Sequence, residues 1–342
     1  IKIKLISFED YQILINEFKG ETITFYNSVL WLKHIIKSFN INIVAVATFD
    51  NEERLLSITP FAYKKKFIFK LYGSPLSGLF TLYMGPIFKK DISNGLKSEI
   101  LQLQNNYLMN KAHYIEYGID QMLGKWQISE AILLQNSFQL IQRPTYMIDL
   151  AQGEEFVWEN FKSRARNMIR KAEKNNVTVS AIKADKQWIT NFYDMLTETY
   201  KKQNKEVPHN KNFYQNLIEL QSSESIEFYS AFHDSKIISS AIFLINNNKK
   251  IYMSGTSSLI GMKYAANTLI QWCSMTDAIS KGIAKYDLGG LGVAKIDKFK
   301  ESFGGKLYYD TRWVYKNRFV ILIEPIIKIF NYFNFFKIKI GE

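Results

Sequence analysis

Residues 264–305 read YAANTLIQWCSMTDAISKGIAKYDLGGLGVAKIDKFKESFGG, and this stretch decides the fold. Residues at helical spacing in its first half predict a helix with one buried face. They are Leu269, Trp272, Cys273, Thr276 and Ile279. Gly282 ends that helix, residues 283–288 form a strand, and the glycines within 289–292 then allow backbone to approach backbone or ligand. A helix followed by a strand and a glycine-rich turn commonly forms the edge of a binding cleft in an α/β sheet.

The residues just before this stretch predict three strands joined by short turns. Residues 226–233 alternate apolar and polar side chains, 237–245 form a longer apolar run, and 251–256 follow a turn at 246–248. Three strands in a meander, a crossover helix and another strand resemble the core order of the GNAT acyltransferase fold.

The first half of the chain repeats this plan. Residues 24–39 predict a helix, residues 41–72 contain three strands, 96–109 predict a second helix, and 112–119 predict a further strand. We therefore expect an α/β fold with mixed sheets, built as two tandem GNAT-like domains with a cleft between them. The first domain would cover 1–150, with 311–342 packing back on it, and the second would cover 151–310.

Composition narrows the class of protein. The chain has 342 residues, 47% of them hydrophobic, and a formal charge of +12, which favours polyanionic partners such as nucleic acid, anionic lipid or phosphorylated substrates. The alternative is that much of this charge is only a solvating surface. With one cysteine and no visible signal peptide, we expect a cytoplasmic protein without disulfides.

Several kinds of chemistry lack their sequence signals. The four histidines are isolated from one another and from paired carboxylates, so we expect no metal site. The chain has no phosphate-binding P-loop, no GxGxxG and no GxSxG. An enzyme of this sequence would work by positioning two substrates and stabilising developing charge.

Two charged or apolar stretches could bind large partners. In residues 156–176, one helix face would carry a basic stripe that binds phosphate or tRNA, or that is only solvated. The stripe consists of Lys162, Arg166, Arg170 and Lys174. Residues 319–340 are strongly apolar but interrupted by charges and Pro325, so they predict packing on the first domain or contact with the inner membrane surface.

Three stretches resemble the Fem family of peptidoglycan bridge-forming aminoacyltransferases, whose fold is two GNAT-like domains. They are residues 146–179, residues 272–290 with A-x-x-x-G-x-x-x-Y-D-L-G-G, and residues 299–305, FKESFGG. The chain lacks a long helical-hairpin arm, so the compact FemX form fits best. The GSPLSG segment at 73–78 is similar to a related branch that acylates sugars or amino acids of envelope polysaccharides and lipids.

The resemblance implies roles for particular residues. Lys300 matches the lysine that stabilises the tetrahedral oxyanion, or it is only a surface cation, and Asp120 is a candidate to accept the proton of the attacking amine. The remaining residues are expected to bind substrate, and the lysines among them are expected to bind the phosphates of the acceptor. They are Trp31, Lys33, Lys37, Lys201, Lys202, Tyr264, Phe299, Phe303 and Gly304.

The expected function is aminoacyl transfer from aminoacyl-tRNA to an amine of a cell-envelope precursor, without a cofactor beyond the co-substrate. The turn at 257–267 is a degenerate version of the loop that holds the pyrophosphate of acyl-CoA, so an N-acyltransferase using acyl-CoA or an acyl carrier remains an alternative. A second alternative is a non-catalytic protein that binds nucleic acid or a membrane surface.

Overall fold

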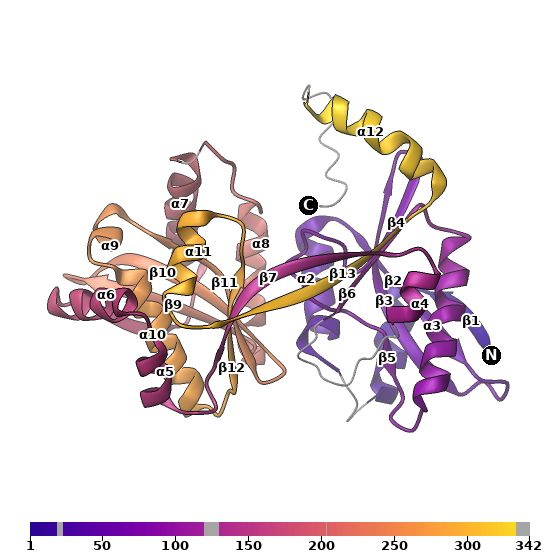
Figure 1. The fold of residues 1–342 in the computed structure, drawn as a ribbon, viewed down its shortest axis with the longest axis horizontal. Helices are drawn as coiled ribbons and strands as arrows, with labels where there is room; N and C mark the ends of the chain where they lie inside the picture. The colour runs from indigo at the N-terminus through magenta and orange to yellow at the C-terminus, as the bar shows by residue number, and fades with distance from the viewer. Residues whose placement is uncertain (19–22, 120–129, 203, 333–342) are drawn as a thin grey trace. The chain divides into compact units, whose positions relative to one another are not determined.

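The computed structural model describes residues 1–18, 23–119, 130–202 and 204–332, and it divides the chain into two compact units (Figure 1). Unit 1 comprises Ile1–Arg143 and Asp310–Glu342, and unit 2 comprises Pro144–Tyr309. The boundaries fall within strands β7 (Gln139–Asp149) and β13 (Lys306–Lys316), so each of these strands contains residues of both units.

Unit 1 is built on a mixed sheet with the strand order β1-β2-β3-β4-β6-β13, in which only the β4–β6 pair is parallel. Its strands are β1 (Lys2–Ile6), β2 (Asn42–Phe49), β3 (Leu55–Lys66), β4 (Phe69–Ser74), β5 (Ile87–Phe88) and β6 (Tyr114–Ile119). Its helices are α1 (Phe8–Leu14), α2 (Val29–Phe39), α3 (Asn94–Met109), α4 (Glu130–Gln135) and α12 (Arg318–Tyr332).

Unit 2 repeats this design with the strand order β7-β12-β11-β10-β9-β8, in which only β11–β12 is parallel. Its further strands are β8 (Thr178–Ile182), β9 (Ile226–His233), β10 (Lys236–Asn246), β11 (Lys249–Ser257) and β12 (Lys285–Gly290). Its helices are α5 (Glu154–Asn160), α6 (Ser163–Lys174), α7 (Lys186–Lys201), α8 (Lys211–Asn216), α9 (Leu259–Lys263), α10 (Ala266–Ser280) and α11 (Ala294–Glu301).

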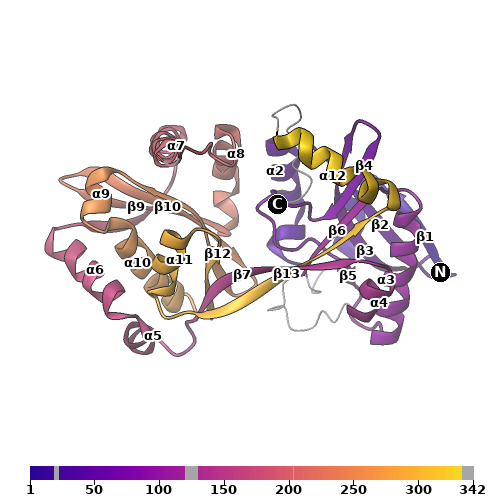
Figure 2. The same ribbon diagram turned by 45° about the horizontal axis from the view of Figure 1, so that its top comes forward.

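Both units contain the predicted meander, crossover helix and parallel strand. In unit 1, β2, β3 and β4 lead through α3 to β6, and in unit 2, β9, β10 and β11 lead through α10 to β12. Figure 2 shows α7 and α8 over one face of the unit 2 sheet and α10 over the other. The expected fold class is therefore confirmed for each unit.

Two predicted helices differ from the structure. The helix expected over 24–39 begins only at Val29, because the Ser28 hydroxyl caps it by accepting the Trp31 amide at 3.2 Å. The helix expected over 156–176 is two helices, since Phe161 and Lys162 have extended backbone between α5 and α6.

The buried face of α10 is also wider than the pattern indicates. Ile270, Met275 and Ala278 are fully buried, whereas Trp272 and Cys273 are only partly so. Trp272 packs its ring against Trp158 and Phe161 instead, with ring centroids 5.2 and 5.4 Å apart. Helix α10 therefore contacts the sheet and α5–α6 with different sides.

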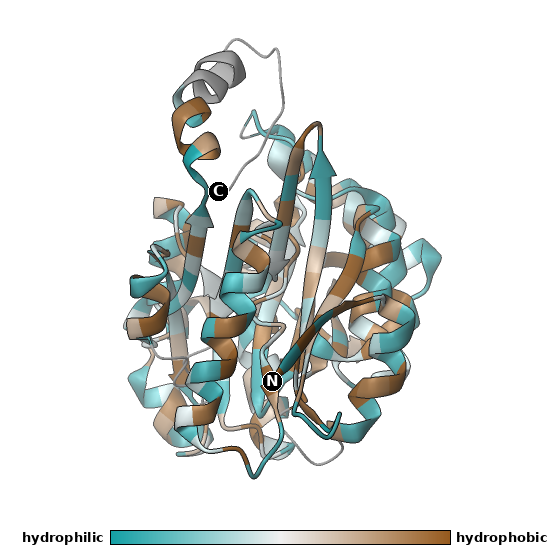
Figure 3. Cartoon of the chain, turned by 90° about the vertical axis from the view of Figure 1, so that its right-hand side faces the viewer, coloured by the Kyte–Doolittle hydropathy of each residue, from teal (hydrophilic) through white to brown (hydrophobic). Residues whose placement is uncertain are grey.

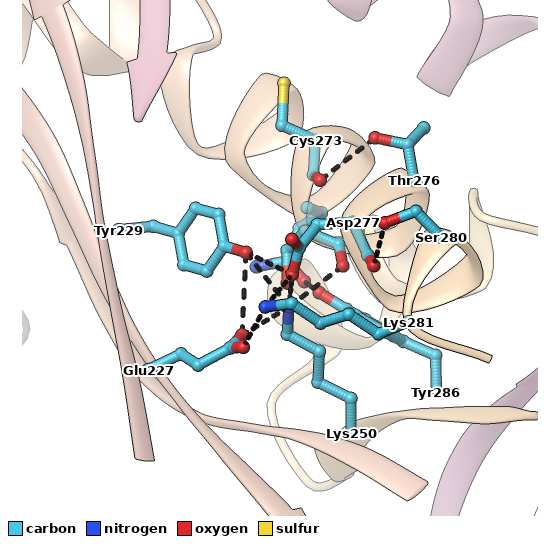
Figure 4. Close-up of polar contacts among 11 residues, drawn as sticks. Glu227, Tyr229, Lys250, Cys273, Thr276, Asp277, Ser280, Lys281 and Tyr286 are labelled. Atoms are coloured by element: carbon cyan, nitrogen blue, oxygen red, sulfur yellow. Dashed lines mark hydrogen bonds and ion pairs between the residues drawn. The ribbon is translucent and has the colours of Figure 1, made fainter. Parts of the chain in front are cut away.

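A buried ionic cluster joins β9, β11 and α10 in unit 2 (Figure 4). The fully buried Lys250 ammonium lies 2.6 Å from Glu227 and 3.0 Å from Asp277. Lys281 contacts the same two carboxylates at 2.6 and 2.9 Å, and the Tyr229 hydroxyl donates to Asp277 at 2.7 Å. Two cations thus balance two carboxylates, so this cluster ties the helix to the sheet without excess charge.

Within the described ranges, every helix is too short or too polar to cross a lipid bilayer.

Candidate functional site

The candidate site lies where β12 ends in its glycine turn and α11 returns a buried lysine to it. Lys300 on α11 is only 6% exposed, and its Nζ donates to the carbonyl oxygens of Gly290 at 2.7 Å and Gly289 at 3.0 Å. Burial lowers the pKa of Lys300 to about 8, although Asp287 and Asp297 favour its charged form. The alternative of a surface cation is therefore wrong, because this amine is held inside unit 2.

The backbone at this turn requires glycine. Gly289 has φ of 78°, and a Cβ there would lie 3.0 Å from the Tyr252 carbonyl oxygen and 3.5 Å from Lys300 Nζ. A side chain would be strained in this conformation and would crowd the Tyr252 carbonyl oxygen. The glycine turn that the sequence predicted thus brings backbone close to the ammonium group.

A buried carboxylate holds the turn from within the sheet. Asp287 is 1% exposed, and its Oδ1 accepts from the Gly289 amide at 2.8 Å and from the Thr145 hydroxyl at 2.5 Å. Its Oδ2 lies 3.9 Å from the Nζ of Lys249, a buried residue on β11. The turn therefore lies between a hydrogen-bonded carboxylate and the lysine of α11.

The other residues of the FKESFGG motif position α11. Phe303 is fully buried, and its ring lies 5.3 Å from Phe161 and 5.2 Å from the partly buried Phe299. Gly304 has φ of 70°, and a Cβ there would lie 2.0 Å from the Asn160 carbonyl oxygen. Phe303 and Gly304 thus serve packing. Full burial of Phe303 corrects the expectation that it binds substrate directly, whereas Gly304 is exposed and its expected substrate contact stays a prediction.

The geometry leaves the lysine able to act on a developing negative charge. A protonated lysine has three N–H donors, and within the described structure two of them are directed at the Gly289 and Gly290 carbonyls. The third can donate to an oxyanion, in a buried setting where a charge is weakly screened.

The expected basic stripe on residues 156–176 is not a single surface, because the helix breaks at its first member. Lys162 precedes α6 and forms an ion pair with Glu301 at 2.5 Å. Arg166 donates from Nη1 to carbonyl oxygens at the end of α5, including those of Glu159 at 3.0 Å and Phe161. Arg166 therefore donates hydrogen bonds to carbonyl oxygens at the end of α5 that have no donor within the helix.

The two remaining members of this stripe are exposed on α6. Arg170 lies over the Trp158 ring, with its Cζ 5.7 Å from the ring centroid, and Lys174 is in the last turn. These two side chains keep access to an anionic partner, as does Lys162, whose side chain is 54% exposed beside Glu301, whereas Arg166 is partly buried against the end of α5.

In unit 1, Trp31 is a core residue. It is 0% exposed, its ring packs on Phe25 and Tyr26, and its Nε1 donates to the Thr81 hydroxyl at 2.9 Å. It therefore cannot present its ring to a substrate, which corrects the expected contact. Lys33 and Lys37 lie exposed on the same helix, α2.

The remaining expected residues of unit 2 lie on elements other than α11. Lys201 and Lys202 are exposed at the end of α7, and Tyr264 follows α9 with its ring 4.8 Å from that of His233. Asp120 lies outside the described residues. The structure thus brings Phe299, Phe303 and Gly304 together with Lys300, and among the described residues of unit 2 the hydrogen bonds of the Lys300 side chain go to Gly289 and Gly290.

The turn between β11 and α10 is filled by the short helix α9. A Cβ on Gly261 would lie 2.1 Å from the Ile238 carbonyl oxygen, so this glycine is needed for packing. The amides of Gly261, Met262, Tyr264 and Ala265 donate to acceptors of the turn itself. These four amides are therefore not available to hold a pyrophosphate, whereas no such acceptor is found among the described residues for the amides of Ala266 and Asn267, which begin α10.

A second buried charge pair was not predicted. In unit 1, Arg312 donates to the Glu116 carboxylate at 3.2 Å and to the carbonyl oxygens of Pro75 at 3.0 Å and Thr81 at 2.7 Å. Glu116 also accepts from the Ser77 hydroxyl at 2.6 Å. This pair holds the GSPLSG segment, and the only signal in the sequence is the charged Glu116 inside the otherwise uncharged strand β6.

Comparisons with known proteins agree with this architecture. Residues 159–301 match the model of an acetyltransferase (GNAT) domain. A crystal structure of FemX is similar over 96% of this chain and 99% of its own, with a TM-score of 0.69 and 14% identity. No curated protein matches the sequence.

Two further structures have the same fold at lower identity. One is the C-terminal domain of a putative lysylphosphatidylglycerol synthetase from Agrobacterium fabrum. The similarity covers 95% of this chain and 98% of that chain, with a TM-score of 0.58 and 9% identity. The other is a tandem GNAT protein from the clavulanic acid biosynthesis pathway. The similarity covers 92% of this chain and 98% of that chain, with a TM-score of 0.53 and 6% identity.

These likenesses confirm the tandem GNAT-like fold and its resemblance to FemX, and at such identities they show the fold alone. The family-model match adds the class of chemistry. Because it covers α6 through α11 with Lys300 and the β12 turn, the chain is an acyltransferase.

Proposed function

We propose that this chain transfers an aminoacyl group from aminoacyl-tRNA to an amine of a peptidoglycan or other cell-envelope precursor. The observation that carries the proposal is the buried Lys300 ammonium, placed against the β12 glycine turn, where the described residues supply acceptors for two of its three N–H donors. The likeness to FemX supports it at the level of fold.

The reaction needs one addition and one elimination. The acceptor amine attacks the ester carbonyl carbon of the donor, and the carbonyl electron pair moves to oxygen, opposite the Lys300 ammonium. The oxyanion then collapses, the ester C–O bond breaks, and the terminal ribose hydroxyl of the tRNA leaves with a proton. The proton lost by the amine goes to a carboxylate, for which Asp120 remains the candidate, and the protonated carboxyl then gives that proton to the departing ribose oxygen.

The α9 turn supports an aminoacyl-tRNA donor over acyl-CoA. Its amides at Gly261, Met262, Tyr264 and Ala265 are committed to internal acceptors, so acyl-CoA would lose these four donors to its pyrophosphate. A tRNA donor needs an exposed basic surface, which Arg170 and Lys174 supply on α6.

The acceptor phosphates would be bound by exposed lysines. Lys33 and Lys37 on α2, and Lys201 and Lys202 at the end of α7, are the candidates that the fold leaves accessible. Aminoacyl-tRNA is a cytoplasmic donor, so the proposal places the reaction in the cytoplasm.

A binding titration tests the donor. The purified chain is titrated with charged tRNA and with acyl-CoA at two salt concentrations. Salt-sensitive binding of tRNA without binding of acyl-CoA is expected. Binding of acyl-CoA alone would overturn the donor and favour an N-acyltransferase, and tRNA binding without any aminoacyl transfer to an amine would favour the non-catalytic alternative.

A further inference from the structure

The hairpin that joins β3 to β4 ends in two exposed apolar residues. Phe67 and Ile68 form its two-residue loop and are 64% and 59% exposed. Two-residue hairpin loops ordinarily use glycine, asparagine or aspartate, because the first position needs a positive φ. Phe67 has φ of 53°, a conformation that strains a bulky side chain.

The corresponding hairpin of unit 2 has the residue types that are usual in a two-residue loop. Its loop between β10 and β11 is Asn247 and Asn248, with φ of 49° and 58°. The same chain therefore follows the usual turn chemistry in one copy of the meander and departs from it in the other. Departures from local rules of this kind are concentrated at functional surfaces.

Lysines surround the apolar loop. Lys64, Lys65, Lys66 and Lys70 occupy the strand ends next to it, and Lys65 pairs directly with Lys70 across the hairpin. Like charges in register are unfavourable. An anionic partner would relieve the repulsion between Lys65 and Lys70. Burial, and to a smaller extent the neighbouring Lys64, lowers the pKa of Lys66.

Helix α12 adds a second apolar element beside the hairpin. Phe319 stacks on Phe69 with ring centroids 5.8 Å apart, and Ile321 and Leu322 are 53% and 73% exposed. Figure 3 shows hydrophobic colour at the hairpin tip and on the first turns of α12, with hydrophilic residues on the strands below the tip. Apolar side chains ringed by lysines are complementary to a surface that is anionic outside and apolar within.

We propose that the β3–β4 hairpin tip, together with the first turns of α12, docks on the interface of an anionic phospholipid bilayer. Phe67 and Ile68 enter the boundary between headgroups and acyl chains, Ile321 and Leu322 lie on it, and the lysines contact lipid phosphates. This inference goes beyond the proposed transfer reaction and does not depend on it.

Vesicle co-sedimentation of the full chain tests the inference, with vesicles of phosphatidylcholine alone or mixed with phosphatidylglycerol. Wild type is expected to bind the anionic vesicles and to lose binding in high salt. F67G/I68S introduces residues that suit this turn, so it should fold at least as well, yet bind at least tenfold more weakly. Neutralising Lys64, Lys65 and Lys70 with glutamine should weaken binding about fivefold per lysine.

The matched control is Ile13→Ser, which removes a 69% exposed apolar residue from α1 and should leave vesicle binding unchanged. Equal binding to both kinds of vesicle, no binding to either, or wild-type binding by F67G/I68S would overturn the proposal. So would self-association that F67G/I68S abolishes in the absence of vesicles, since the tip would then contact a second copy of the chain.

Discussion

Replacing Lys300 by methionine removes the charge at the candidate site and keeps nearly the same side-chain volume. A unit charge about 3 Å from an oxyanion contributes about 5 kcal/mol at an effective dielectric of about 20. Only part of that charge has developed in the transition state, so about 3 kcal/mol would be lost. We therefore expect turnover to fall by roughly 10² to 10³.

The assay is single-turnover transfer of a labelled aminoacyl group to the amine of a peptidoglycan precursor, with thermal unfolding of each variant as the folding control. Lys298→Met is the matched control, because Lys298 is exposed on the same helix and loses the same charge. Wild-type turnover in the Lys300 variant, or an equal loss in the Lys298 variant, would refute the role given to Lys300.

Three further predictions follow from the described contacts. Because the pKa of Lys300 is lowered to about 8, the rate of transfer should decline as pH rises through about 8, and kcat of Lys300→Arg should not show that decline. Between about 8 and the ordinary pKa of lysine, the unfolded chain binds more protons than the folded chain. The free energy of unfolding should therefore rise with pH in this range. Gly304→Ala should lower the free energy of unfolding in urea by about 3 kcal/mol or more, because its Cβ would lie 2.0 Å from a carbonyl oxygen. Gly282→Ala, at φ of 73° in open space, should lose only about 1 to 2 kcal/mol, and equal losses would contradict the steric reason. Arg166→Met should destabilise unit 2 by about 1 to 3 kcal/mol in the same titration, since carbonyls at the end of α5 lose their donor, whereas Lys174→Met should change little.

The order of helices and strands was predictable because it depends on neighbours in the sequence. Alternating strands at 226–233, turn residues at 246–248 and helical spacing after residue 264 are local signals. The break at Phe161 was not, since the Lys162 amide donates to the Ser302 carbonyl oxygen at 2.9 Å, far along the chain. The helical periodicity of a sequence cannot indicate a hydrogen bond between residues that are far apart in the chain.

The sequence by itself determined the repeated meander and the motif that contains Lys300, because both consist of residues close together in the chain. Only the tertiary structure decided that Trp31 is core, that Arg166 caps a helix end, and that Asp287 holds the glycine turn. Thr145 reaches Asp287 across 142 positions of sequence. Such contacts depend on which strands become neighbours in the sheet, and sheet order is set by burial of the whole apolar surface.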